Sequence, residues 1–337
     1  MEAAGRHNRR GVPKRPGFDN LNVSREMQPM AVYTTIYPGV EMYLTDWYRS
    51  VREQTDQDFQ LWIGLDGIEA TAVEAAIGSR LDVVWVPSEP GSTPALIRQG
   101  SLAQIIEDFD AVVLVDSDDI LHPTRVAAAR AALQTSELAA CALRLVDQNR
   151  HDLRTTLTLP EQTAPDSILP RNNVFGFSNS AYRSELLRRC LPVPTEVALV
   201  DWFLATKAWL LGARLAFDPV VRMDYRQHGA NMAPIRFPFD ANQVIRDTKK
   251  VRDHYRLLQT SRFENVLPDR WAQVQEAAAD VQLFSEQVTS QPSKLEDYVR
   301  NLNRLEPEVV WWWDVAQPAL QWMWKDYAGV PYEVSKN

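Results

Sequence analysis

The chain has 337 residues, of which 45% are hydrophobic and 24% charged, as in an ordinary globular protein with a substantial core. Its formal net charge of −8 argues against a nucleic-acid-binding protein, which would usually be basic, although a metal ion would let an acidic chain take an anionic substrate. Two cysteines in a chain of this length do not make a disulfide framework, and no apolar run approaches the roughly 20 residues that span a bilayer. We therefore expect a cytoplasmic protein without a signal peptide or a membrane span.

Residues 1–29 are basic, contain Gly and Pro, and hold little that a core would bury. This composition predicts a disordered tail, or translation from a start upstream of the alternative starts Met27 and Met30. A contact between this segment and an acidic membrane surface is the competing interpretation.

From Met30 onward, strand and helix patterns alternate. Five segments are rich in β-branched or apolar residues and end at turn signals, which predicts strands; they are residues 31–37, 59–67, 81–87, 111–119 and 138–147. Helical spacing predicts helices between some of them, over residues 43–54, 94–109 and 123–136, the last with Pro123 in its first turn. This alternation predicts an α/β fold, with a mostly parallel sheet covered by helices on both faces.

Beyond Asp147 the periodicity weakens. We expect a short β segment or loop over residues 150–173, a helix over 201–212 closed by Gly212, and a pair of strands within 213–229. From about Phe239 the chain is predicted to be mainly helical, including the Trp-rich residues 307–327. The expected organisation is a tail over 1–29, an α/β domain over 30–238 and a helical region over 239–337.

An acidic cluster follows the predicted strand at residues 111–115. Asp116 and Asp118 share a face while the strand geometry lasts, and like charges this close cost free energy unless a cation lies among them. Oxygen ligands suit Mg²⁺ or Mn²⁺, and ligands of such sheets bind at the carboxyl ends of the strands. The alternative is an acidic turn that caps the following helix, with Asp119 as the cap residue.

Three further polar residues stand at positions that suit a site. Asp66 ends a strand and would accept hydrogen bonds from a nucleobase or ribose, unless it only makes an Asp-Gly turn. Asp201 begins a helix, either as a cap or as a general base. His228 lies in the polar turn "YRQHGAN" and would contact a metal or a phosphate, unless its role is structural.

Four pieces of the chain together resemble family 2 glycosyltransferases of the GT-A type. In order they are "SVREQTDQDFQLWIGLDG", "VVLVDSDD", "GFSNSAYRSELL" and "VDWFLATKAWLLGARLAFDPVVRMDYRQHGAN", and the resemblance covers roughly residues 30–232. It implies a Rossmann-like GT-A sheet, a nucleotide-diphosphate sugar as donor with UDP as the expected nucleotide, and Mn²⁺ or Mg²⁺ as cofactor. It also implies inverting transfer of a hexosyl-type sugar to a hydroxyl of a glycan or lipid-linked acceptor, as in bacterial polysaccharide assembly.

The resemblance assigns roles by position in the motifs. Asp201 would be the catalytic base, Asp118 the principal metal ligand, Asp116 a neighbour of ribose and metal, and His228 a contact of the metal or the diphosphate. The residues that would bind the nucleotide sugar are Thr35, Tyr37, Asp66, Arg98, Asp116 and Ser117. The acceptor would meet the segment that contains Gly176, Ser178 and Asn179.

The sequence departs from the family pattern at three places. The stretch "LDGI" (residues 65–68) stands where Asp-Asp-Gly-Ser is usual, so that only one acidic residue remains there; Val200 stands where a glutamate is common, and Gln99 replaces an asparagine. These departures weaken the assignment of the donor more than that of the transfer reaction, because the aspartates expected to hold the metal and to act as the base are present.

Two other functions remain as alternatives. A nucleotidyltransferase would need a Gly- and Lys-rich loop after the first strand, and "TTIYPGVEM" lacks one. A non-catalytic nucleotide-sugar-binding protein is the other alternative, against which the intact Asp118 and Asp201 argue.

The tryptophans near the end of the chain are not explained by the resemblance. They are Trp311, Trp312, Trp313, Trp322 and Trp324. Three consecutive residues cannot all face one side of a helix, so we expect this segment to pack on the catalytic domain. A homodimer interface and a peripheral contact with a membrane or lipid-linked acceptor are the alternatives.

Overall fold

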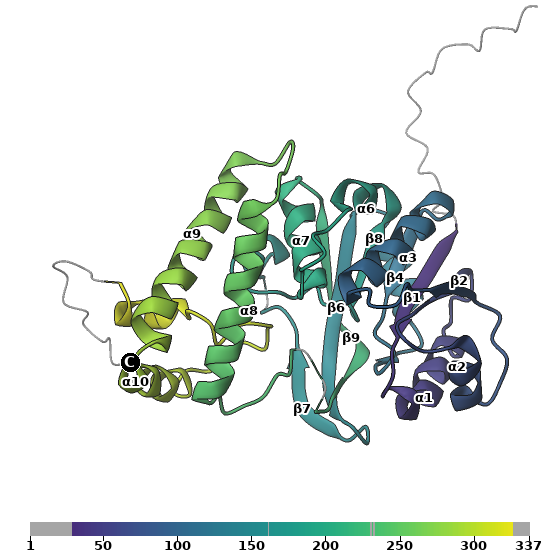
Figure 1. The fold of residues 1–337 in the computed structure, drawn as a ribbon, viewed down its shortest axis with the longest axis horizontal. Helices are drawn as coiled ribbons and strands as arrows, with labels where there is room; N and C mark the ends of the chain where they lie inside the picture. Colours follow the sequence, from purple (N-terminus) through teal and green to yellow (C-terminus); the bar gives the residue numbers. More distant parts are fainter. Residues whose placement is uncertain (1–28, 161, 230, 232, 326–337) are drawn as a thin grey trace, which may run out of the picture.

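The computed structural model describes residues 29–160, 162–229, 231 and 233–325 (Figure 1). Its strands are β1 (Met30–Ile36), β2 (Phe59–Leu65), β3 (Val84–Pro87), β4 (Ala111–Leu114), β5 (Ile120–Leu121), β6 (Leu138–Asp147), β7 (Asp152–Leu157), β8 (Ser180–Arg183) and β9 (Leu215–Gln227). Its helices are α1 (Glu41–Arg52), α2 (Ala70–Ile77), α3 (Pro94–Asp108), α4 (Arg125–Ala132), α5 (Pro165–Ile168), α6 (Ser184–Cys190), α7 (Val200–Leu210), α8 (Ala241–Thr260), α9 (Pro268–Phe284) and α10 (Pro292–Leu302). A π-helical turn, η1 (Ser285–Thr289), follows α9, and a 3₁₀ helix, η2 (Pro318–Met323), lies near the end of the described chain. The predicted tail falls outside the described residues except for Pro29.

The described strands form one sheet of nine, in the order β3-β2-β1-β4-β8-β6-β9-β5, with β7 beside β6. β1 is parallel to β2 and β4, β2 to β3, and β6 to β9, whereas β8 runs antiparallel between β4 and β6. Six strands (β1, β2, β3, β4, β6 and β9) therefore point the same way, which confirms the expected mostly parallel α/β sheet.

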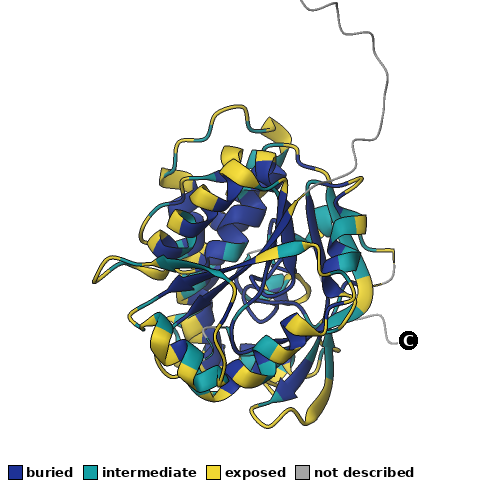
Figure 2. Cartoon of the chain, turned by 90° about the vertical axis from the view of Figure 1, so that its right-hand side faces the viewer, coloured by how far each residue is buried: buried dark blue, intermediate teal, exposed yellow. Residues whose placement is uncertain are grey.

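The core lies on both sides of the central strands. Every residue of β1 and of β4 is buried, which explains why neither sequence alternates between polar and apolar residues, since alternation is lost when both faces of a strand are covered. Helix α1 shows the expected one-sided pattern: Leu44, Trp47 and Val51 are buried, while Arg49 and Arg52 face solvent. Figure 2 shows the buried strands enclosed by helices whose outer sides are exposed.

Three local predictions were wrong. Pro123 does not lie in the first turn of α4, which begins at Arg125; its carbonyl instead accepts a hydrogen bond from the backbone N–H of Thr55 at 2.7 Å. Residues 215–227 form one long strand, β9, rather than two, because register shifts let it follow β6 over its whole length and also reach β5. The Trp-rich stretch is helical only in η2.

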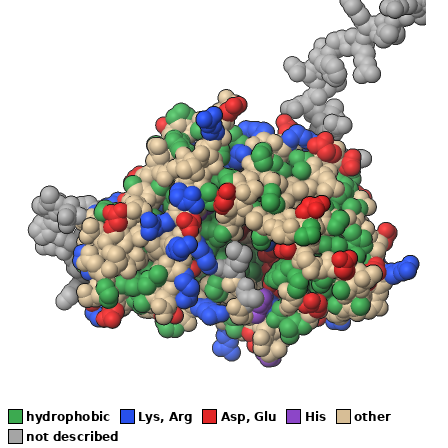
Figure 3. All heavy atoms as spheres, viewed as in Figure 1, with side chains coloured by type: hydrophobic (Ala, Val, Ile, Leu, Met, Phe, Trp, Pro, Cys, Tyr) green, Lys and Arg blue, Asp and Glu red, His purple; other side chains and the backbone are tan. Residues whose placement is uncertain are grey.

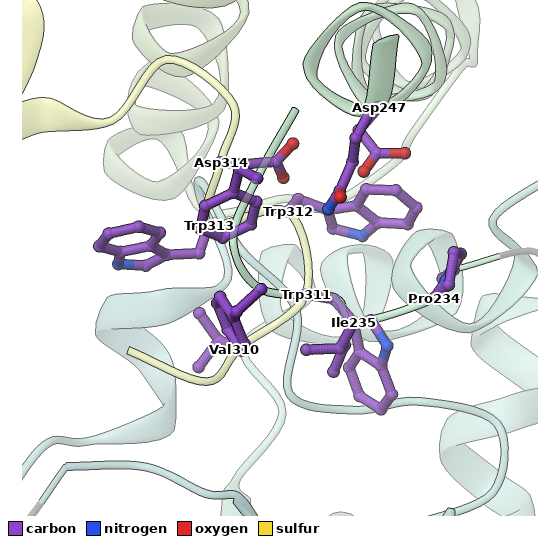
Figure 4. Close-up of a pocket in the computed structure, with 12 residues that line it drawn as sticks. Pro234, Ile235, Asp247, Val310, Trp311, Trp312, Trp313 and Asp314 are labelled. Atoms are coloured by element: carbon purple, nitrogen blue, oxygen red, sulfur yellow. The ribbon is translucent and has the colours of Figure 1, made fainter. Parts of the chain in front are cut away.

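The segment 310–314 is an irregular loop packed against the sheet domain. Trp311 forms an isolated antiparallel bridge with Asn173, and Trp312 has a φ of +71°. The three indoles point in different directions (Figure 4), with Trp313 stacked on Phe239 at 5.7 Å between ring centroids. All three are buried, as expected for a segment that packs on the catalytic domain, whereas Trp322 is 50% exposed. None of the helices in the described ranges is long and apolar enough to cross a bilayer.

We expect Gly176→Ala to loosen this packing. A Cβ at Gly176 would lie 2.4 Å from Cη2 of Trp311, so the indole or the backbone must move, at a cost of about 1–3 kcal/mol in the free energy of unfolding. Gly100→Ala is the matched control, because a Cβ at Gly100 on α3 meets nothing within 4 Å and alanine is favoured in a helix. Urea unfolding of both variants checks the prediction, which fails if Gly176→Ala is as stable as Gly100→Ala.

A second prediction concerns the buried carboxyl groups of Asp247 on α8 and Asp314, which line one cavity beside the tryptophans (Figure 4). Burial, with a smaller contribution from the charge of Asp240, raises the pKa of Asp247 to about 6. The charges of Lys250 and Arg246 oppose this rise. Burial, together with the charge of Asp247, raises the pKa of Asp314 well above its ordinary value. Both carboxyl groups therefore favour the folded state in their protonated forms.

The contribution of Asp247 to stability is complete below the ordinary pKa of 3.8 and is lost as the pH rises through about 6. Asp247→Asn should therefore gain stability relative to the wild type over that rise, on the order of 1–3 kcal/mol. Unfolding measured as a function of pH tests this, with Asp297→Asn, a change at an exposed residue on α10, as the control. Equal pH profiles for wild type and Asp247→Asn would contradict it.

Candidate active site

A cavity of about 280 Å³ opens where β1, β2 and β4 end. Its lining comprises Thr35, Tyr37, Asp66, Pro94, Arg98, Asp116, Asp118, Gly176, Phe177, Ser178, Ala198, Leu199, Asp201, Tyr225, Asn231, Ala233, Trp311 and Trp312. Figure 3 shows this face hollowed near its centre, with Lys and Arg side chains gathered over α8 beside the hollow. The cavity thus combines polar groups from the sheet with apolar walls, as ligand sites commonly do.

Asp116 lies at the mouth of the cavity against an arginine. Its carboxylate accepts a hydrogen bond from Nη2 of Arg98 at 3.1 Å and another from the Ser178 hydroxyl at 3.2 Å. Arg98 lies on α3, whose N-terminus is stabilised in two ways. The Thr93 hydroxyl caps it by accepting a hydrogen bond from the N–H of Leu96 at 3.3 Å, and Pro94 is the first helical residue. Burial raises the pKa of Asp116 to about 6, against the lowering effect of Arg98.

Asp118 is paired with the predicted histidine. Nε2 of His228 lies 2.8 Å from Oδ2 of Asp118, and both side chains are nearly buried, at 7% and 9% exposed. The turn that carries His228 is held by Asn231, whose side-chain oxygen accepts from the N–H of His228 at 2.5 Å and whose amide donates to the carbonyl of Arg226 at 2.9 Å.

Asp119 is not a helix cap. It is fully buried, accepts a hydrogen bond from the Arg226 N–H at 2.7 Å and another from the Ser178 hydroxyl, and so joins the end of β4 to β9 and to the loop before β8. Burial and the neighbouring charge of Asp118 raise its pKa well above the ordinary value. Its role is therefore structural.

Asp201 also lines the cavity, from the first turn of α7. The helix N-cap is Leu199, and the Asp201 carboxylate accepts a hydrogen bond from Nδ2 of Asn173 at 3.3 Å. Burial raises the pKa of Asp201, although hydrogen bonds from backbone N–H groups, including that of Trp202, oppose part of the rise. A carboxylate with a raised pKa that faces a cavity is suited to taking a proton.

The structure brings most of the predicted site residues together. Thr35, Tyr37, Asp66, Arg98, Gly176 and Ser178 all line the cavity.

Three of the predicted site residues are not among those that line the cavity: Ser117, Asn179 and His228, the last of which lies behind the lining residue Asp118 and contacts it. Ser117 is fully buried and donates its hydroxyl to the carbonyl of Thr35 at 2.9 Å. Asn179 is also buried, and its amide donates to the carbonyls of Cys141 at 2.6 Å and Val174 at 3.0 Å. Both positions carry polar residues because backbone groups beneath the site need partners.

The structure shows the surroundings of two residues that depart from the family pattern, Gln99 and Val200. Gln99 points away from the cavity, and its side-chain oxygen accepts from the N–H of Val193 at 2.9 Å. Val200 is buried, at 2% exposed.

Sequence reasoning missed several lining residues. Tyr225 and Asn231 belong to motifs that had been singled out for His228 alone, and Trp311 and Trp312 come from the far end of the chain. The Trp triplet was the visible signal, but nothing in its pattern indicated that it reaches the site.

The donor set around Asp118 fits a divalent cation that completes its shell with substrate oxygens. No group of three or more His, Cys, Asp or Glu residues in the described ranges is arranged to hold a metal by itself. Asp118 and Asp116 offer carboxylate oxygens at the cavity wall, and Nε2 of His228, which is not among the lining residues, lies against Asp118. Such an open arrangement is typical of ions that also bind phosphates.

Comparison with solved structures shows what this fold resembles. The crystal structure of residues 1–349 of S. aureus TarS in complex with UDP superposes with a TM-score of 0.51 at 18% identity, covering 77% of this chain and 72% of that one. The same fragment in complex with UDP-GlcNAc gives 0.50 at 17% identity, covering 82% and 91%. The mannosyltransferase PcManGT from Pyrobaculum calidifontis, in complex with GDP-Man and Mn²⁺, gives 0.52 at 15% identity, covering 85% and 78%.

No protein-family model matches the sequence. No functionally curated protein matches it either. The likeness is thus one of structure rather than of sequence, and it confirms the sheet architecture that the motifs implied. The chain has the fold of GT-A glycosyltransferases.

Proposed function

We propose that the chain is a glycosyltransferase that moves a sugar from a nucleotide-diphosphate donor to an acceptor hydroxyl with inversion at the anomeric carbon. One observation carries this proposal: a single cavity is lined by Asp66 and Arg98, by Asp116 and Asp118, and by Asp201. The two neighbouring folds with bound nucleotide sugars support it.

The donor would lie along the side formed by β1, β2 and α3. Tyr37 and Asp66 offer an aromatic ring and a carboxylate to the base and ribose, and Arg98 offers a cation to the diphosphate. Arg98 is already oriented by Asp116 and by the ring of Phe177, which lies 4.1 Å from its guanidinium carbon. We propose UDP as the nucleotide, and a glycan or lipid-linked molecule in bacterial glycan assembly as the acceptor.

Asp118 and His228, with Asp116, would hold Mg²⁺ or Mn²⁺ against the diphosphate. Bound there, the cation would offset the negative charge that grows on the leaving group. The residues themselves position the donor, because Asp118 and His228 are fixed to each other and His228 is fixed by Asn231.

Asp201 would act as the base. Its carboxylate takes the proton of the acceptor hydroxyl as that oxygen bonds to the anomeric carbon, while the bond from this carbon to the diphosphate oxygen breaks on the opposite face. Asn173 holds the carboxylate in place, so donor and acceptor meet in a fixed geometry.

Asp201→Asn should bind donor normally but transfer sugar about 10²- to 10⁴-fold more slowly, since general-base catalysis contributes that much. Asp269→Asn is the matched control, because Asp269 occupies the same position in the first turn of α9 and is exposed. Donor titration and product analysis after incubation with acceptor distinguish the two variants.

The pH dependence gives a second check on the same residue. The pKa of Asp201 lies above its ordinary value of 3.8, so the wild-type rate should fall as the pH is lowered through that raised pKa, where the base becomes protonated. The residual rate of Asp201→Asn should lack this acid limb. Transfer at the wild-type rate in the variant would show that Asp201 is not the base, and a protein that only binds nucleotide sugars would show no transfer in either form.

His228→Ala should remove the metal-dependent part of nucleotide binding. In the wild type we expect UDP to raise the melting temperature more in the presence of Mn²⁺ than without it, by ligand linkage; in the variant the two shifts should converge. His151→Ala, a change at a 77% exposed side chain, should behave as wild type. A full metal-dependent shift in His228→Ala would exclude His228 from the site.

A further inference from the structure

The Asp201 side of the cavity ends in aromatic walls that come from the C-terminal segment. We propose that Trp311 and Trp312 form the acceptor subsite, as a platform on which a pyranose ring of the acceptor lies. This inference rests on the proposed function, because it takes Asp201 to be the group that receives the acceptor's proton. It makes residues outside the family resemblance part of the active site.

Trp311 is tied to the proposed base through one residue. The backbone of Asn173 pairs with that of Trp311 in both directions, at 3.3 and 3.2 Å, while its side chain donates to Asp201 at 3.3 Å. The indole packs on the bare backbone of Gly176, where even a methyl group would come within 2.4 Å, and meets the ring of Tyr225 edge-on at 5.7 Å. The loop is therefore built to bring this ring to the wall of the cavity.

Trp312 is held by a stack of aromatic rings. Trp202, the residue after Asp201, lies between His254 on α8, at 4.0 Å and 7°, and Trp312, at 6.1 Å and 11°. The φ of +71° at Trp312 is costly for a residue with a side chain. With this backbone conformation, Trp312 lines the cavity while Trp313 turns to the other side of the loop and stacks on Phe239 (Figure 4). Strain kept at the edge of a cavity points to a role for the ring placed there.

The chemistry of this wall suits a sugar. One face of a pyranose presents C–H groups, which gain from burial against an apolar ring and carry the positive edge that an aromatic face attracts. Asp201, which lines the same cavity as the tryptophans, offers a carboxylate to a hydroxyl of such a ring. The residues that we assign to the nucleotide do not include the tryptophans, and Trp311 is tied through Asn173 to Asp201, so we assign the Trp wall to the acceptor.

The test compares substitutions at neighbouring tryptophans. Binding of the methyl α- and β-pyranosides of glucose, galactose, mannose and N-acetylglucosamine is measured by saturation-transfer NMR and calorimetry, on protein with and without UDP and Mg²⁺. We expect the wild type and Trp313→Leu to bind at least one of these probes at millimolar concentration. Trp312→Leu and Trp311→Leu should bind it about tenfold more weakly, a loss of about 1.4 kcal/mol, with UDP affinity unchanged.

Each outcome is informative. Trp312→Phe keeps an aromatic face and should retain most of the binding, so it carries the test if the leucine variant does not fold. The inference is overturned if no pyranoside binds the wild type, or if Trp311→Leu and Trp312→Leu bind like Trp313→Leu. It is also overturned if the two variants lose UDP in proportion, since the rings would then serve the donor. A wild type that binds pyranosides but no nucleotide would contradict the proposed function and leave the platform standing.

Discussion

The site depends on how the fold accommodates three carboxylates within four residues at the end of a buried strand. Each is stabilised differently: Asp119 by the hydroxyl of Ser178 and a backbone N–H of β9, Asp116 by Arg98, and Asp118 by His228. Because the partners come from α3, from the loop before β8 and from the turn after β9, the cluster ties these elements to one point. Burying these three carboxylates costs free energy, and the partners that offset this cost also bring α3, the loop before β8 and the turn after β9 together around the cavity.

Much of the architecture could be predicted because its signals are local. The lack of polar–apolar alternation in β1 and β4 and the one-sided pattern of α1 follow from burial, and the carboxyl ends of parallel strands bring Thr35, Asp66 and Asp116 to one edge. Asp201 and His228 are candidates because they stand in motifs that resemble those of GT-A enzymes. That Asp201 lines the same cavity as the acidic cluster, and that His228 contacts Asp118, could be learned only from the fold.

What could not be predicted depends on contacts between distant segments. Ser117 and Asn179 carry the residue types of a binding site, but backbone carbonyls already occupy their donor groups. The Trp triplet reads as helical, yet a bridge to Asn173 and a left-handed residue at Trp312 turn it into a loop. No periodic pattern in the sequence predicts that Trp311 and Trp312, more than a hundred residues after Asp201, line the same cavity as Asp201.

The stack of Trp202 between His254 and Trp312 has a consequence for competing reactions. His254 is buried, both ring nitrogens lack a hydrogen-bond partner within the described ranges, and burial lowers its pKa to about 3, so the imidazole in the stack is uncharged at neutral pH. In the reaction that we propose, an apolar wall of this kind would keep water from the anomeric carbon beside Asp201. Loss of the C-terminal segment would thus do more than shorten the chain: it would shift the balance from transfer toward wasteful hydrolysis of the donor.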